Sequence, residues 1–175
     1  MNPSCRIGIF GGSFDPVHLG HVKLAEKAFK LKSLQRIYFI PVKRSPFKSL
    51  GPQASAQDRL SMLRLALGKN PVFKISSCEL RRSAPSYTIH TVRFFRKKFP
   101  RAELFLLMAA DAMKHFGKWK NSVEIRKECR FLSSKRIGRI SSRDIRSRAA
   151  FGQSLKGWVP GKVESYILRK GLYGA

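Results

Sequence analysis

Acidic residues are scarce in this sequence. Ten Asp and Glu residues stand against 36 Lys and Arg residues, which gives a formal net charge of +26 at pH 7. A charge of this size attracts polyanions and makes their binding sensitive to salt. The basic residues are spread along the chain, with one local excess between Arg126 and Arg148. We therefore expect a phosphate-rich partner, and a merely solvated basic surface is the alternative.

Cysteines and long apolar runs are scarce as well. Cys5, Cys78 and Cys129 are odd in number and far apart, which fits neither a disulfide framework nor a zinc cluster, so we expect reduced thiols. The longest apolar run, 104–110, is far shorter than the ~20 residues that a membrane span needs. The first residues also lack the pattern of a signal peptide. We expect a cytoplasmic protein without a spanning helix.

Short apolar runs alternate with segments of helical period, and the length of 175 residues suits one domain covering 1–175. The runs of strand length are 7–10, 36–40, 72–75 and 104–108, and the helical segments are 19–32, 56–69 and 87–99. Ser55 and Asp58 form a plausible capping box for the second helix. This alternation predicts an α/β fold in which helices cover both faces of a parallel sheet.

The pattern weakens after residue 108. Residues 131–133 form only a weak strand signal, and 135–140 show no pattern. Two further helices are predicted, one that starts near Ser141 and Ser142 and one over 160–169.

A glycine-rich turn follows the first predicted strand. Gly11, Gly12 and Ser13 lead into a helix from Leu19, so main-chain N–H groups and a helix N-terminus lie together, where an anion binds favourably. His18 and His21 can point at the same pocket, as phosphate donors, as metal ligands or as structural side chains. Two nitrogen ligands without a nearby Cys or Glu make zinc a poor fit. Asp15 is expected to shape the turn by bonding its own backbone.

The string "GGSFDPVHLGH" resembles the ATP-binding signature of the nucleotidyltransferases with an HxGH motif. Further segments, "IPVKRSPFK", "SYTIHT", "AADAMKHFGKW", "ISSRDIR" and "VPGKVESYILRKGLY", resemble the bacterial nicotinate mononucleotide adenylyltransferases in this order across nearly the whole chain. The resemblance implies a Rossmann-like three-layer sandwich. It also implies transfer of AMP from ATP to nicotinate mononucleotide, which yields nicotinate adenine dinucleotide and pyrophosphate in NAD biosynthesis.

The resemblance also assigns roles to individual residues. His18, His21 and Arg146 would be catalytic, with one imidazole stabilising charge at the α-phosphate. The ATP-binding residues would be Gly11, Gly12, Ser13, Phe14, Lys48, Asp111, Ser141 and Ser142. Trp119 would stack on the pyridine ring, and backbone donors at Tyr87 and Thr88 would receive the nicotinate carboxylate. Mg²⁺ would be held mainly through the ATP phosphates, with no metal site of the protein's own.

The sequence departs from the family pattern at several positions. Arg143 replaces a threonine, Ala109 replaces a glycine, and Phe47 occupies a position that is often histidine. The connection between Arg136 and Ser141 is much shorter than in the family. Two alternatives therefore stay open: adenylyl transfer to another phosphate acceptor, as in phosphopantetheine adenylyltransferases, and a non-catalytic relative that binds nucleotide or nucleic acid through its basic surface.

Overall fold

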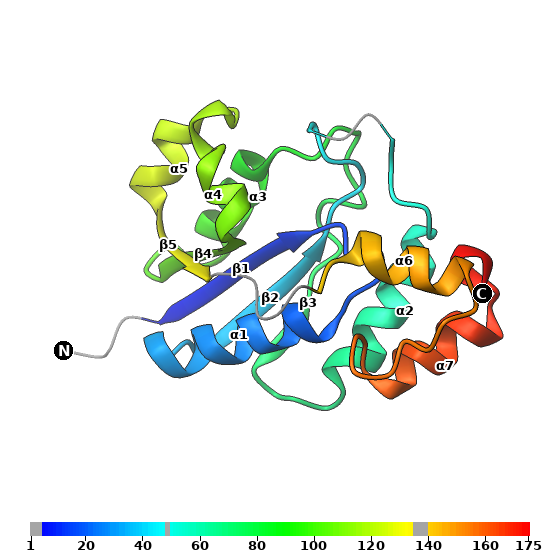
Figure 1. Ribbon diagram of the computed structural model, residues 1–175. Coiled ribbons are helices and arrows are strands. Elements are labelled where there is room, and N and C mark those ends of the chain that lie inside the picture. Colours follow the sequence, from blue (N-terminus) through cyan, green and yellow to red (C-terminus); the bar gives the residue numbers. More distant parts are fainter. Residues whose placement is uncertain (1–4, 48–49, 135–139) are drawn as a thin grey trace.

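The computed structural model describes residues 5–47, 50–134 and 140–175. In this part of the chain, parallel strands form a single sheet in the order β3-β2-β1-β4-β5 (Figure 1). The strands are β1 (Arg6–Gly12), β2 (Arg36–Pro41), β3 (Phe73–Ile75), β4 (Glu103–Ala109) and β5 (Cys129–Ser134). The chain runs outward from β1 to β3 and then returns to the other side of β1 at β4. The predicted parallel sheet is confirmed.

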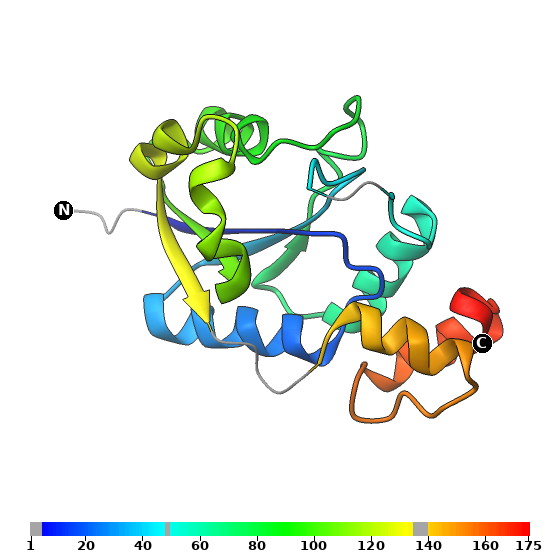
Figure 2. The ribbon, with the colours of Figure 1, turned by 45° about the horizontal axis from the view of Figure 1, so that its top comes forward.

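Helices cover both faces of the sheet and make three layers (Figures 1 and 2). One side carries α1 (Leu19–Lys32) and α2 (Ala56–Leu67), with α6 (Ser142–Ala150) and α7 (Gly161–Arg169) packed beyond them. The other side carries α3 (Thr88–Lys98), α4 (Ala110–Lys114), the 3-10 turn η1 (Phe116–Lys118) and α5 (Ser122–Glu128). A last 3-10 turn, η2 (Leu172–Gly174), ends the chain. This arrangement is the predicted α/β sandwich.

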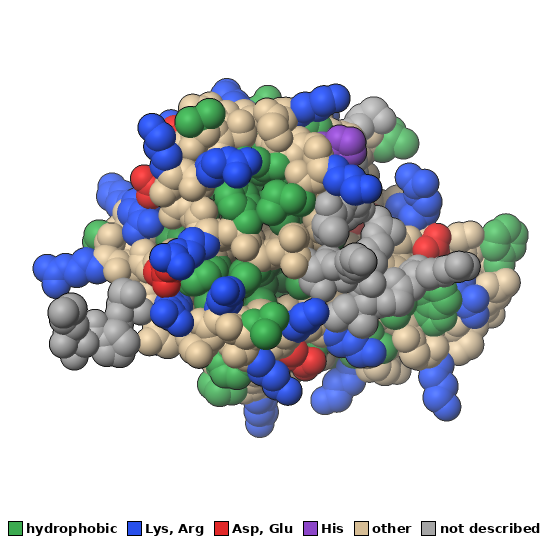
Figure 3. All heavy atoms as spheres, turned by 60° about the vertical axis from the view of Figure 1, so that its left-hand side comes forward, with side chains coloured by type: hydrophobic (Ala, Val, Ile, Leu, Met, Phe, Trp, Pro, Cys, Tyr) green, Lys and Arg blue, Asp and Glu red, His purple; other side chains and the backbone are tan. Residues whose placement is uncertain are grey.

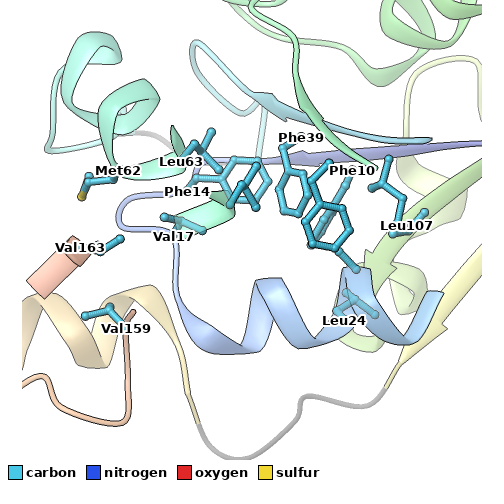
Figure 4. Close-up of a cluster of buried hydrophobic side chains, with 14 of the residues drawn as sticks. Phe10, Phe14, Val17, Leu24, Phe39, Met62, Leu63, Leu107, Val159 and Val163 are labelled. Atoms are coloured by element: carbon cyan, nitrogen blue, oxygen red, sulfur yellow. The ribbon is translucent and has the colours of Figure 1, made fainter. Parts of the chain in front are cut away.

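Side chains that alternate along the strands divide into two cores. In β2, Ile37 and Phe39 pack with α1 and α2, whereas Tyr38 and Ile40 pack against α3. This division follows from the period of two in a strand buried on both faces. Figure 4 shows the first core, where the ring of Phe39 lies 5.3 Å from that of Phe10 and 5.7 Å from that of Phe14.

The element boundaries agree closely with the sequence pattern. Helix α1 covers the predicted range, and the Ser55 hydroxyl caps α2 by accepting from the Asp58 N–H at 3.1 Å. Helix α2 ends at Leu67, before the predicted residue 69, because Gly68 takes a positive φ of 56° that stops the helix. The weak signal at 131–133 is a sheet strand, β5. The pattern missed α4, η1 and α5, which are short.

The positive charge has few partners within the protein. Ion pairs among the described residues use carboxylates such as Glu103, Glu124 and Glu128, which bind Arg6, Arg93 and Arg96 at 2.7–3.1 Å. Because basic residues outnumber acidic ones more than threefold, most cations have no carboxylate to pair with. Figure 3 shows them scattered over one face of the molecule. Anions of any kind are therefore attracted to the surface.

Other expectations concern the membrane and the cysteines. No helix in the described part of the chain is both long and apolar enough to cross a bilayer. Cys5 is an exposed free thiol, and Cys78 and Cys129 are buried free thiols. Burial raises the pKa of the Cys129 thiol to about 12, so this sulfur stays protonated and unreactive.

Candidate active site

A cavity of about 1180 Å³ opens at the carboxyl ends of β1 and β4. The strand order reverses between these two strands, and ligands of open α/β sheets bind at such a switch point. The cavity exceeds the roughly 300–1,000 Å³ of a typical small-molecule site. Most of the predicted site residues line it: Gly11, Gly12, Ser13, Phe14, His18, His21, Tyr87, Thr88, Trp119, Ser141, Ser142 and Arg146.

Two predicted site residues cannot be assigned to the cavity wall. Lys48 lies outside the described residues. Asp111 lies in α4, directly after β4, at the sheet edge where the cavity opens. The shortened connection from Arg136 also lies largely outside the described residues, which resume at Ile140. The roles assigned to these positions stay predictions.

The glycine-rich turn forms the floor of the cavity. A Cβ atom on Gly11 would meet no atom within 4 Å, so the main chain there is open to close approach by a ligand. A Cβ atom on Gly12 would lie 3.1 Å from the ring of Phe14, which is buried and has a positive φ of 47°. The Phe14 side chain therefore belongs to the core, and its contribution to a ligand site is its main chain.

His18 and His21 form a stacked pair at the start of α1. Their ring centroids are 3.6 Å apart, with an interplanar angle of 27°. The His18 main-chain N–H donates to Nδ1 of His21 at 3.2 Å. Burial, and secondarily the charge of His18, lower the pKa of His21 well below its ordinary value of 6.5. His21 is thus neutral at pH 7 with its proton on Nε2, where it can donate a hydrogen bond.

Gly20 makes room for this pair. A Cβ atom there would lie 3.0 Å from Nδ1 and 3.1 Å from Cε1 of His18. The His18 ring is therefore held between the Gly20 main chain and the His21 ring. This contact is the physical reason for a glycine between the two histidines.

The serines at the start of α6 bond to the protein itself. Ser141 is the N-cap, and its hydroxyl accepts from the Asp144 N–H at 3.2 Å and lies 2.7 Å from Oδ2 of Asp144. The Ser142 hydroxyl donates to the Pro16 carbonyl at 3.0 Å. This geometry accounts for both hydroxyls as structural groups. The donors that remain for an anion in the cavity are the first main-chain N–H groups of α6.

The Asp15 side chain accepts hydrogen bonds from a distant loop, and not from its own backbone as expected. The residue is 3% exposed, and its carboxylate accepts from the N–H groups of Gln53 and Ala54 at 2.8 and 3.0 Å, in a loop far along the chain. The partners are non-local because the turn is folded against that loop, which the local Asp-Pro signal does not reveal. Asp15 still shapes the turn, as predicted.

Sequence reasoning missed two buried charged residues beside the cavity. Nη1 of Arg59 donates to the carbonyls of Ser13 and Val42, both at 2.8 Å, and so holds the glycine-rich turn against the end of β2. Glu79 is 4% exposed and accepts from the Thr91 hydroxyl at 2.5 Å, and burial raises the pKa of its carboxyl. Arg59 lies in a helix and Glu79 in a turn, and the neighbouring residues in the sequence do not indicate that either side chain is buried.

The far end of the cavity is aromatic and basic. Trp119 is half-buried, with its ring 5.5 Å from that of Phe116 and 6.3 Å from that of Phe47 on the opposite loop. The ammonium of Lys120 lies 4.6 Å from the centroid of the Tyr87 ring. A flat ring with a negative substituent would find a stacking surface and a cation here.

Among the described residues, no three His, Cys, Asp or Glu side chains lie together as a metal cluster. Of the carboxylates that line the cavity in the described part of the chain, Asp15 accepts from the N–H groups of Gln53 and Ala54, Glu79 accepts from the Thr91 hydroxyl, and Asp144 is bonded to Ser141. This donor set does not form a cage for a divalent ion. It is compatible with an ion that arrives on the phosphates of a nucleotide.

A switch-point cavity with a histidine pair on a glycine-rich turn is the arrangement that the sequence analysis predicts for a nucleotidyltransferase. The family model described as cytidylyltransferase-like matches residues 9–156, so the chain belongs to this family. A protein of Thermus thermophilus named a probable nicotinate-nucleotide adenylyltransferase is 39% identical over 96% of this chain and 99% of its own length. Within the wider family, the chain belongs to the nicotinate-nucleotide adenylyltransferases.

Solved structures agree with this fold. A Vibrio parahaemolyticus protein described as a "putative nicotinate-nucleotide adenylyltransferase" superposes with a TM-score of 0.81 at 20% identity, covering 97% of this chain and 95% of its own. The nicotinic acid mononucleotide adenylyltransferase of Plasmodium falciparum, solved as a complex with NaAD, gives 0.76 at 18% identity, covering 97% and 98%. At these identities the likeness establishes the fold.

The comparison with Thermus thermophilus also bears on chain length. The alignment extends over 186 positions, although this chain has 175 residues. The relative therefore has residues that this chain lacks.

Proposed function

We propose that this chain transfers the adenylyl group of ATP to nicotinate mononucleotide, which forms nicotinate adenine dinucleotide and releases pyrophosphate. The observation that carries the proposal is the stacked pair of His18 and His21 on the floor of a cavity whose far end holds Trp119. One end of this cavity suits a triphosphate, and the other suits an aromatic ring with a carboxylate.

The reaction needs no general base. The attacking group is a phosphate oxygen of nicotinate mononucleotide, which is already ionised near pH 7. This oxygen forms a bond to the α-phosphorus of ATP, and the bond from that phosphorus to the bridging oxygen of the β-phosphate breaks. Catalysis then consists of holding the two anions in line and stabilising the charge that develops.

The histidines and Arg146 would supply that stabilisation. Neutral His21 offers its Nε2–H as a hydrogen-bond donor, and the open main chain at Gly11 allows the phosphates to approach closely. Arg146 lines the same cavity and carries a permanent positive charge. These groups are fixed before the substrate binds, so little reorganisation accompanies the reaction.

Nucleotidyltransferases of this kind generally use a divalent metal. We propose that this metal is Mg²⁺, held mainly through the phosphates of ATP, because Mg²⁺ in nucleotide sites is usually bound through substrate phosphates and water. The ion would neutralise phosphate charge and so lower the repulsion between ATP and the anionic acceptor. Tyr87 and Thr88, at the start of α3, and Trp119 would bind the nicotinate end of that acceptor.

A turnover assay tests the proposal. The full chain is incubated with ATP, Mg²⁺ and one of three acceptors, nicotinate mononucleotide, nicotinamide mononucleotide or phosphopantetheine, and pyrophosphate is measured. We expect turnover with nicotinate mononucleotide and a loss of roughly 100-fold or more in His18→Ala. His115→Ala is the matched control, because His115 is exposed and does not line the cavity. Pyrophosphate release no higher than that of His18→Ala contradicts the proposal, and release with phosphopantetheine alone favours the other acceptor class.

A further inference from the structure

Asp15 joins the glycine-rich turn to the last residues of the chain. Oδ1 of its buried carboxylate accepts from the Tyr173 hydroxyl at 2.9 Å. Tyr173 lies in η2, two residues before the end of the chain. Burial, and secondarily the charge of Asp15, raise the pKa of Tyr173 well above its ordinary value, so its hydroxyl remains a donor.

The same aspartate holds Arg146. Nη1 of Arg146 donates to the main-chain carbonyl of Asp15 at 2.7 Å and lies 3.7 Å from Oδ2 of its carboxylate. The Arg146 side chain is 24% exposed and lines the cavity. One edge of the guanidinium is thus fixed on Asp15, while the side chain still lines the cavity.

The C-terminal turn also packs directly on the helix that carries Arg146. A Cβ atom on Gly174 would lie 3.5 Å from Cα of Ala150, the last residue of α6. Gly171 and Gly174 have positive φ values of 59° and 86°, which lets the chain fold back tightly at this point. The hydroxyl of Tyr173 therefore reaches Asp15 from a turn that is fixed in place.

We infer that Tyr173 is a positioning residue for the phosphate-binding site, which acts by holding the Asp15 carboxylate and, through it, the guanidinium of Arg146. The inference rests on the proposed function, since it takes Arg146 as a ligand of the ATP phosphates. The C-terminal turn is then part of the catalytic machinery, although Tyr173 itself does not line the cavity. A purely structural tyrosine would affect stability alone.

The chain offers a matched control for this idea. The hydroxyl of Tyr166 in α7 donates to Oδ1 of Asp58 at 2.9 Å, the same kind of bond at the same length. Asp58 belongs to α2, and neither residue of this pair lines the cavity. Tyr166→Phe thus removes an equivalent hydroxyl near the C-terminus without touching Asp15 or Arg146.

The experiment compares Tyr173→Phe with Tyr166→Phe, each alone and in the Arg146→Ala background. Three quantities are measured on the full chain: Tm, kcat/KM for ATP, and the Kd of a non-hydrolysable ATP analogue. We expect Tyr173→Phe to lower kcat/KM about tenfold and to weaken analogue binding, because small displacements of a positioned group are costly. Tyr166→Phe should stay within about twofold of wild type at a similar Tm. The loss in Tyr173→Phe should disappear once Arg146 is absent.

Equal activity and equal analogue affinity in the two phenylalanine variants would overturn the inference. So would a loss that persists unchanged in the Arg146→Ala background, because Tyr173 would then act by another route. If wild type releases no pyrophosphate, the proposed function fails. The analogue affinities then still decide whether Tyr173 and Arg146 act together at a phosphate site.

Discussion

Replacing Gly20 by alanine separates the stability of α1 from the position of the two imidazoles. Gly20 is the second residue of the helix, and alanine is the better helix former, by about 0.5–1 kcal/mol in a helix interior and by less in the first turn. The added Cβ atom would, however, lie 3.0 Å from Nδ1 of His18. This contact is tighter than an ordinary van der Waals contact, so the ring must move by a few tenths of an ångström.

The His18 ring has little room for that movement. The His21 ring stacks on it with a centroid distance of 3.6 Å, and His18 as a residue is only 7% exposed. A shift of His18 therefore displaces His21 as well. If these two imidazoles bind the reacting phosphates, a displacement of this size should lower kcat/KM roughly 10- to 100-fold. This loss corresponds to about 1.4–2.7 kcal/mol of transition-state stabilisation.

The assay measures pyrophosphate release and Tm for Gly20→Ala beside Gly161→Ala. Gly161 also lies in the first turn of a helix, α7, but a Cβ atom there would meet nothing within 4 Å. We expect both variants to unfold within a few degrees of wild type and only Gly20→Ala to lose turnover. Wild-type turnover in Gly20→Ala would refute the reasoning, since either the rings do not move or their position does not matter.

Two further predictions concern His21 and Trp119. The folded protein disfavours the imidazolium of His21, so stability from this group is present above pH 6.5 and is lost as the pH falls below it. The free energy of unfolding of wild type, relative to that of His21→Gln, should therefore decrease with falling pH by at most about 1.4 kcal/mol per pH unit. Chemical denaturation of both proteins at several pH values measures this difference in unfolding free energy. A difference that does not change with pH contradicts the buried neutral ring. Trp119→Leu should raise KM for nicotinate mononucleotide roughly three- to tenfold and leave KM for ATP unchanged. The control is Trp158→Leu, because Trp158 does not line the cavity. An equal rise in both KM values of Trp119→Leu would count against stacking on the acceptor.

Much of the fold could be predicted because its signals are local. A strand buried on both faces reads as a short apolar run, and β1, β2 and β4 are such runs. Helix α1 and the cap of α2 follow from residues three or four positions apart. The short elements between β4 and β5 were missed because a helix of five to seven residues shows too little periodicity.

The candidate site divides in the same way. The turn with His18, Gly20 and His21 is continuous in the sequence, so the order of the residues alone predicts that its glycines and imidazoles lie together at one cavity. The roles of Asp15 and Tyr173 could not, because a tyrosine near the end of the chain carries no mark of its partner 158 positions earlier.

The sequence by itself determined the α/β alternation and the glycine-rich turn with two imidazoles on one helical turn. These depend on backbone preferences and side-chain periodicity within a few residues. The tertiary structure alone decided that Asp15 would bind residues 38, 39, 131 and 158 positions away and that Arg59 would clamp the turn against β2. Such bonds form only where packing of the two cores excludes water and brings distant segments together, which no local pattern records.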